Sequence, residues 1–244
     1  MNIIAIDSKY EPFLRTLPDI FDKQGTLIHE GRNTLKTIDF NGETLVVKRF
    51  GQLRLWQRII YTFFRGSKAK RSYKYALRLQ EKGIGTPHPK GYVETTEHGL
   101  LADAYYVCSY AEQYHTFKEL ILPSDIADRK QLLWAIGDFT GRLHNEGIRH
   151  KDYSAGNILF HDNSRTQPYR QFSLQLVDLN RLHFGHVTTH AGLRNFERLN
   201  IDREALTVMA HAYALRRGLD PDCCAKYIIR HRWHKHVKNA TTNL

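Results

Sequence analysis

The sequence predicts an α+β fold of two lobes, a strand-rich first lobe and a short, helical second lobe. In the first lobe, apolar residues alternate on both sides of Asn41-Gly42, which is typical of an antiparallel hairpin because both residues tolerate positive φ. From Arg129 onward, apolar residues recur every three or four positions, which indicates a helix. A connector near residue 111 divides the 244 residues into lobes at 1–110 and 111–244.

Three antiparallel strands are expected first, at residues 27–31, 35–40 and 44–50, with the hairpin between the second and third. A helix follows at residues 67–82. Its inner side is predicted to carry Tyr73, Ala76, Leu77 and Gln80, and Gly83 ends it in the usual C-terminal position. Two more strands, at 91–94 and 100–110, complete the first lobe.

Between the third strand and this helix, residues 53–64 form a basic segment rich in apolar residues. Trp56, Ile60 and Phe63 share one helical side, together with Leu53 and Phe64, and Arg54 and Arg58 lie on another. The segment is therefore expected to be an amphipathic helix. Its apolar side either docks on the first lobe or enters an anionic bilayer interface, and the sequence leaves both open.

The second lobe begins with a helix from Arg129, followed by strands at 158–160 and 174–177 and by mostly helical chain from residue 204. The apolar positions of the first helix are Leu132, Leu133, Ile136, Phe139, Thr140 and Leu143. Three histidines near the end of the chain, His231, His234 and His236, alternate with Arg and Lys, which favours a cationic helix end over a metal site.

The net charge of +11 is concentrated in two segments. Residues 44–80 contain ten basic residues and residues 225–244 contain five, and neither segment contains an acid. Such a local positive field favours an anionic partner. A nucleic acid is not expected, because aromatic residues follow apolar spacing instead of alternating with the basic ones. The positive charge favours an anionic glycolipid or membrane surface.

Composition and cysteine use indicate a globular protein of a reducing compartment. Hydrophobic residues make up 41% and charged residues 25%, which excludes a disordered or fibrous chain. Cys108, Cys223 and Cys224 are too few for a disulfide framework, and Cys108 is expected to be a packed core residue. An early acid, Asp7, interrupts any signal-peptide core, and no apolar stretch is long enough to span a membrane. A cytoplasmic location is expected, with peripheral contact at the inner face of the inner membrane.

The residues that carry chemistry lie between positions 148 and 180. His150, Asp152 and Asn157 form an H-x-D-x-x-x-x-N pattern before a short apolar strand, and a second apolar strand leads to Asp178. Phosphoryl transfer requires a carboxylate that orients the attacking hydroxyl, together with oxygen ligands for magnesium. Asp152 suits the first role, and Asn157 and Asp178 suit the second. His150 is expected to brace the loop.

The first lobe offers matching groups for a nucleotide. Lys48 lies on the third strand, in a V-V-K pattern, where a lysine is able to bind the α- and β-phosphates. Gly31 alone remains of a glycine-rich loop before it. The glutamate that usually pairs with such a lysine is missing, because the helix at 67–82 has a single acid, Glu81, in its last turn. Lys48 is therefore predicted to be held by Asp178 or by the nucleotide.

Five short segments carry a resemblance to a known family. They are LHNEGI at 143–148, HKD at 150–152, GNIL at 156–159, VDLN at 177–180 and GIGTP at 83–87. With these segments the chain resembles the lipopolysaccharide kinase family of the Kdo/WaaP type, a branch of the protein-kinase-like superfamily. The resemblance implies one bilobal kinase-like domain, ATP and Mg²⁺ as cofactors, and phosphorylation of a sugar hydroxyl, on Kdo or heptose, in the lipopolysaccharide inner core.

Departures from protein kinases point to an acceptor other than protein. Asn180 replaces the glycine of D-F-G, Ser154 stands where a lysine is usual, and no A-P-E motif follows Asp178. Two alternatives remain. The degenerate glycine loop is compatible with a non-catalytic pseudokinase that binds nucleotide, and a related fold is compatible with a kinase of another small-molecule or protein acceptor.

Overall fold

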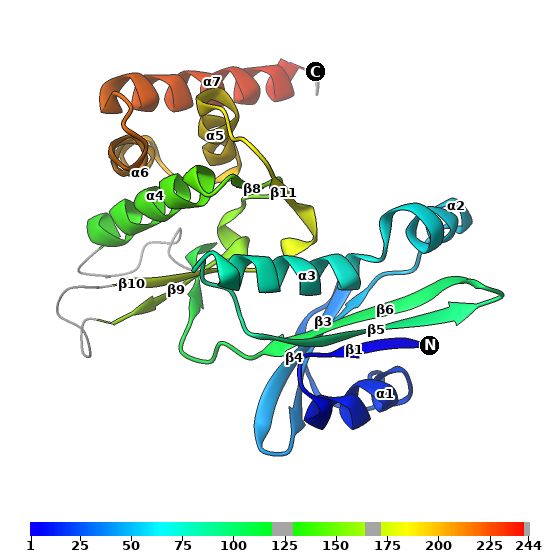
Figure 1. The fold of residues 1–244 in the computed structure, drawn as a ribbon. Helices are drawn as coiled ribbons and strands as arrows, with labels where there is room; N and C mark the ends of the chain where they lie inside the picture. Colours follow the sequence, from blue (N-terminus) through cyan, green and yellow to red (C-terminus); the bar gives the residue numbers. More distant parts are fainter. Residues whose placement is uncertain (119–128, 164–171, 242–244) are drawn as a thin grey trace. The chain divides into compact units, whose positions relative to one another are not determined.

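The computed structural model describes residues 1–118, 129–163 and 172–241, the last ten of these as backbone (Figure 1). The chain forms two compact units. The first comprises Met1–Glu112 together with Asp178–Asn180, and the second comprises Gln113–Val177 and Arg181–Leu244. The short segment Asp178–Asn180 thus groups with the first unit although it lies far along the chain.

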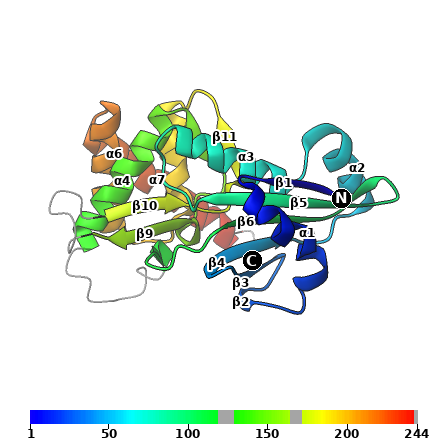
Figure 2. The ribbon, with the colours of Figure 1, turned by 60° about the horizontal axis from the view of Figure 1, so that its bottom comes forward.

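The first unit is built on a six-stranded antiparallel sheet in the order β1-β5-β6-β4-β3-β2 (Figure 2). Its strands are β1 (Asn2–Ala5), β2 (Thr26–His29), β3 (Asn33–Phe40), β4 (Glu43–Phe50), β5 (Pro89–Glu97) and β6 (Leu100–Ser109). Asn41 and Gly42 join β3 to β4 with φ values of 52° and 80°, so the predicted hairpin is confirmed.

The helices of the first unit are α1 (Glu11–Ile20), α2 (Leu55–Ile60), the π-helical turn η2 (Tyr61–Arg65) and α3 (Lys68–Glu81), with the short turn η1 (Ser8–Tyr10) before α1. Ser67 caps α3 by accepting from the Lys70 amide, and Gly83 follows the helix with φ 63°. The predicted inner face of α3 is correct at Tyr73 and Ala76. It is wrong at Gln80, which is exposed, since Leu79 is buried there instead.

Two N-terminal elements were not expected from the sequence. β1 pairs with β5, and α1 packs Phe13, Leu14 and Leu17 into a cluster that contains Val47 and Val93. A buried polar contact accompanies this packing, because Lys90 binds both Glu43 and the Tyr10 hydroxyl. The first 21 residues therefore complete the core on the face of the sheet to which Val47 points.

The second unit is mainly helical. It contains β7 (His115–Thr116), α4 (Arg129–Asn145), β8 (Ile148–His150), η4 (Ala155–Asn157), β9 (Ile158–Asp162), β10 (Phe172–Leu176), β11 (Leu182–Phe184), α5 (Thr189–Leu193), η6 (Arg194–Arg198), α6 (Arg203–Arg217) and α7 (Pro221–Thr241). All six apolar positions predicted for the first helix are buried in α4. α4 packs on α6, where Gly137 lets the Met209 carbonyl approach closer than a Cβ would allow.

Two short antiparallel sheets hold the loops of the second unit. β10, β9 and β7 form one, and β11 and β8 form the other.

His144, at the end of α4, is fully enclosed between Tyr213 and Asn195, and burial lowers the pKa of its ring to about 3. β8 begins at Ile148, three residues after the last residue of α4, so the chain passes from the packed α4–α6 pair directly into the segment that contains His150 and Asp152.

Candidate active site

Lys48 lies on β4, in the middle of the sheet between β3 and β6. Because side chains alternate along a strand, Lys48 points to the face opposite Val47 and the α1 cluster. Its ammonium group forms an ion pair with the Asp178 carboxylate and lies 5.2 Å from the centre of the Phe50 ring. Glu81 is exposed at the end of α3 and does not contact Lys48 in the described structure. The predicted contact of Lys48 with Asp178 is thus confirmed.

Asp178 is held in an uncommon backbone conformation. Its φ is +55°, a left-handed value that few non-glycine residues adopt, although Asp is one of the residue types that adopt it more readily. The side-chain amide of Asn180 donates to Asp178 Oδ1 at 2.7 Å, and Asn180 itself is buried. Sequence reasoning identified Asn180 only as a departure from D-F-G. The structure shows that its amide helps to orient the Asp178 carboxylate.

Gly31 lies in the turn between β2 and β3, exposed and with ordinary negative φ. A side chain there would approach only the His29 ring. The glycine that this turn requires is Gly51, just after β4, because a Cβ at Gly51 would lie 1.9 Å from the Arg32 carbonyl. Its amide also donates to Asn33 Oδ1. The close contact of Gly51 with the turn was not foreseen.

In the second unit, His150 braces the loop that bears Asp152. The Asp152 amide donates to His150 Nδ1 at 3.1 Å, so the proton of the neutral ring sits on Nε2 and is donated to the Val177 carbonyl at 3.0 Å. His150 is fully buried, as is Tyr153, whose hydroxyl is bonded to Thr140 of α4. The bracing expected for His150 is confirmed, and it ties the loop to the residue directly before Asp178.

The Asp152 carboxylate accepts hydrogen bonds from two arginines. Arg181 Nη1 donates to Oδ2 at 2.9 Å, and Arg198 Nη1 donates to Oδ1. Each arginine side chain is about half exposed, at 47% and 50%, and that of Asp152 is 26% exposed. Neither arginine was singled out from the sequence, since they lie 29 and 46 residues away. Two positive charges thus stand beside the carboxylate and within reach of solvent.

Asn157 shares this loop with Asp152. Its side-chain nitrogen donates to the Asp152 carbonyl at 2.8 Å, and its own carbonyl accepts from the Val177 amide. Because a carbonyl only accepts, this bond identifies which end of the amide is nitrogen. The amide oxygen receives no hydrogen bond from the described residues. An amide oxygen is a ligand type that hard cations accept.

The two oxygen donors predicted for a cation belong to different units, Asn157 to the second and Asp178 to the first. An amide oxygen and a carboxylate are each ligand types that suit magnesium, which also keeps water and phosphate ligands. No cluster of three or more His, Cys, Asp or Glu able to hold a metal occurs in the described part of the chain. His231 is described, whereas the side chains of His234 and His236 lie outside the described residues.

The comparisons with known proteins agree with these features. The model of the lipopolysaccharide kinase (Kdo/WaaP) family matches residues 22–214. A solved structure titled "WaaP in complex with acyl carrier protein" is similar over 96% of this chain and 99% of its own, with a TM-score of 0.62 and 16% identity. No curated protein matches. At this identity the structural match shows the fold alone, which is protein-kinase-like, as the sequence predicted.

Proposed function

Because the chain belongs to the lipopolysaccharide kinase (Kdo/WaaP) family, we propose that it transfers the γ-phosphate of ATP to a sugar hydroxyl, on Kdo or heptose, of the lipopolysaccharide inner core. Membership of this family supports a kinase that uses ATP and a divalent metal. The identity of the acceptor sugar and the choice of Mg²⁺ as the metal are proposed in addition. Proposed roles for individual residues follow from their placement.

The arrangement around Asp152 is the observation that carries the proposal. The side chains of His150 and Asn157 hydrogen-bond to the backbone of Asp152 and fix the loop, so the carboxylate is positioned before an acceptor arrives. In this role Asp152 orients the acceptor hydroxyl and takes its proton as the oxygen attacks phosphorus. Arg181 and Arg198 beside it would attract an acceptor that carries phosphate or carboxylate groups, as inner-core sugars do.

The residues proposed to hold the nucleotide and its cation come from both units of the chain, Lys48 and Asp178 from the first and Asn157 from the second. Lys48 would bind the α- and β-phosphates, and Asp178 and Asn157 would bind the cation. When bound, that cation neutralises charge on the transferred phosphate. Gly31, in the turn between β2 and β3, is proposed to let backbone approach the phosphates. The glutamate of other kinases is replaced in part by the contacts of Asp178 with Lys48 and Asn180.

The location that fits this function is the inner face of a membrane, where a lipid-linked acceptor is made accessible to ATP. In the described residues no helix is both long and apolar enough to cross a bilayer. A peripheral protein of net charge +11 would be drawn to an anionic surface.

The test offers the purified protein labelled ATP and Mg²⁺ with three separate acceptors: lipid A-core, bulk protein and small free sugars. Label in lipid A-core alone, located on Kdo or heptose by mass spectrometry, is the expected result. Label in protein or free sugars would identify a kinase of another acceptor. Binding of Mg-ATP without transfer to any acceptor would identify a pseudokinase and overturn the proposal.

A further inference from the structure

The α2–η2 segment, residues 55–65, turns its apolar side to solvent. Its exposed residues are Leu55, Trp56, Ile59, Ile60, Phe63 and Phe64. Phe63 and Phe64 are 67% and 82% exposed, which places them among the most exposed large apolar side chains of the described structure. Contiguous apolar surface of this kind marks an interaction site more often than it occurs by chance.

The same segment is attached to the sheet by its polar side. Arg58 Nε donates to the Leu101 carbonyl at 2.8 Å, and its Nη2 reaches both the carbonyl and the carboxylate of Glu97. Thr62 Oγ1 accepts from the Leu101 amide at 2.9 Å. These bonds attach the segment to the β5–β6 hairpin, and Figures 1 and 2 show α2 beside that hairpin. The sequence left open whether the apolar side docks on this unit. Of its five residues only Leu53 is partly buried there, whereas Trp56, Ile60, Phe63 and Phe64 are exposed.

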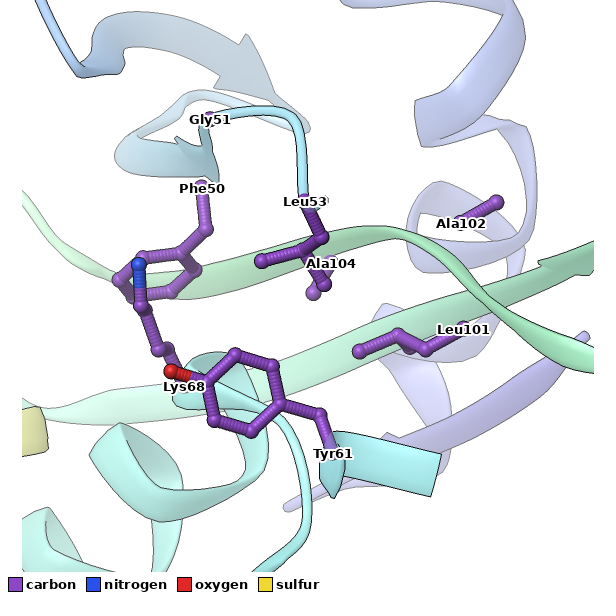
Figure 3. A pocket seen from close by; sticks show the side chains of 8 residues that line it. All are labelled: Phe50, Gly51, Leu53, Tyr61, Lys68, Leu101, Ala102 and Ala104. Carbon is purple, nitrogen blue, oxygen red and sulfur yellow. The ribbon is translucent and has the colours of Figure 1, made fainter. Parts of the chain in front are cut away.

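Beneath the segment the packing is incomplete. A small hollow there is lined by Leu53 and Tyr61 together with Leu101 and Ala104 of β6 (Figure 3). An amphipathic helix in a globular core normally buries its apolar stripe and exposes its charges. Here the arrangement is inverted, so the apolar side is presented outward by directed hydrogen bonds.

Positive charge lies at both ends of this apolar side. Arg54 and Arg65 are exposed there, and the partly buried Lys68 and Lys70 follow on the first turn of α3. Burial, together with the nearby Arg65 charge, lowers the pKa of Arg71. Residues 44–80 contain no acid, and Glu97 of β5, which lies beside the segment, is paired with Arg58. Aromatic and aliphatic side chains flanked by basic ones are suited to an anionic lipid surface.

We infer that α2–η2 is a membrane-docking surface, on which Trp56, Phe63 and Phe64 insert at the level of anionic lipid headgroups while the flanking arginines bind phosphates. This deepens the proposed function and rests on it for its purpose, because docking would bring the enzyme to a lipid-linked acceptor. The docking itself requires no phosphate transfer, so it is tested separately.

The experiment is flotation of the full chain with vesicles that contain phosphatidylglycerol, and with vesicles of phosphatidylcholine alone. We expect retention on the anionic vesicles at low salt and weaker retention at high salt, because the charged contribution is screened. The double variant Phe63→Ser/Phe64→Ser should bind at least tenfold more weakly, which corresponds to about 1.4 kcal/mol. The matched control, Leu215→Ser, removes a side chain that is 61% exposed on α6 and should bind like the unmodified protein.

A second measurement does not depend on folding of the double variant. Trp56 fluorescence should be quenched by brominated anionic lipid, and Trp56→Phe should lose that quenching. Absence of flotation at low salt, equal binding to both kinds of vesicle, or unchanged binding of the double variant would overturn the inference. A dimer in solution that the double variant abolishes would overturn it too, by showing a second copy on this surface.

The result is distinguishable from failure of the proposed function. The double variant should still phosphorylate lipid A-core dispersed in detergent, because Phe63 and Phe64 are outside the proposed nucleotide and acceptor residues. Flotation without any phosphate transfer would remove the proposed function and leave the docking surface in place. Phosphate transfer to the dispersed acceptor without flotation would remove the docking surface and leave the proposed function in place.

Discussion

Asp152 and Asp178 are two carboxylates with opposite surroundings, each from a different unit of the chain. Asp178 accepts from Lys48 and from the buried Asn180, on a backbone held at positive φ. Asp152 lies on a loop that hydrogen bonds to its backbone hold in place, and its partners are two half-exposed arginines. The two carboxylates are exposed to similar extents, 22% for Asp178 and 26% for Asp152, so the difference lies in their partners: Lys48 is 12% exposed, whereas Arg181 and Arg198 are 47% and 50% exposed. The difference teaches that the partners of Asp152 remain open to solvent, which suits the proposed approach of an acceptor to this carboxylate.

The largest effect is expected for Asp152→Asn. The amide preserves the shape of the side chain but is unable to accept the acceptor proton, so turnover should fall by about 10²- to 10⁴-fold, or roughly 3 to 5 kcal/mol of barrier. Binding of Mg-ATP, measured by calorimetry, should stay close to that of the unmodified protein. Unchanged turnover would contradict the role assigned to Asp152.

Asp178→Ala tests the other carboxylate, and it should affect the binding of Mg-ATP. Removing this carboxylate takes away the proposed cation ligand and the partner of Lys48, so Mg-ATP binding should weaken by about 100-fold, or 2.7 kcal/mol. Calorimetric titrations with and without Mg²⁺ measure this loss of affinity. Asp152→Asn is the control, because it should keep its affinity for the nucleotide. Equal Mg-ATP affinity in the unmodified and Asp178→Ala proteins would refute the assignment.

The two units should also respond differently to acid. His144 in the second unit has its pKa lowered to about 3, so below pH 6.5 the unfolded chain gains a proton that the folded chain does not. Stability should therefore fall as the pH falls, by about 2 kcal/mol between pH 7 and pH 5. In the first unit, hydrogen bonds from Lys90 and Tyr10 outweigh burial and lower the pKa of Glu43, so the stability it contributes is lost only below about pH 4.5.

Denaturant unfolding at the two pH values checks this contrast. The variant His144→Gln should lose most of the pH dependence between 7 and 5. The matched variant Glu43→Gln should keep that dependence, although it is less stable at both values. If both variants behaved like the unmodified protein, another group would have to account for the acid sensitivity.

Substitutions at Lys48 and Glu81 test whether Lys48 depends on Asp178 or on a partner from α3. Lys48→Met should cost at least tenfold in kcat/KM, about 1.4 kcal/mol, because the phosphates lose a positive charge that Asp178 holds in place. Glu81→Gln should change kcat/KM little, since Glu81 is exposed at the end of α3. A Glu81→Gln variant as impaired as Lys48→Met would mean that α3 supplies the missing partner during the reaction.

Sequence reasoning reached the features that local patterns determine. The Asn41-Gly42 hairpin follows from the positive φ of two neighbouring residues, and the buried side of α4 follows from helical spacing. The pairing of Lys48 with Asp178 was accessible as well, because a missing glutamate was visible in the sequence. Each of these rests on residues whose spacing has a direct physical meaning.

The remainder depends on contacts between distant residues. Nothing local to Arg181 or Arg198 indicates that both meet Asp152. Similarly, the spacing of α2 shows which residues share a side, but which side faces the sheet is decided by the carbonyls of Glu97 and Leu101. The N-terminal β1 and α1 were missed because their apolar residues gain meaning only against β5 and the sheet.

The smallest effect is expected for Arg198→Gln, which tests whether Asp152 is kept accessible to an anionic acceptor. Exposed ion pairs stabilise a protein by about 0 to 1 kcal/mol, so folding should change little. If Arg198 attracts acceptor phosphate or carboxylate, KM for the acceptor should rise by about fivefold, or 1 kcal/mol, with kcat nearly constant. The increase should shrink at high salt. Arg194→Gln is the matched control, because Arg194 pairs with Glu197 on the same turn and should leave KM unchanged. A fall in kcat at constant KM would instead make Arg198 a positioning residue for Asp152, and the two carboxylates would then be equally locked.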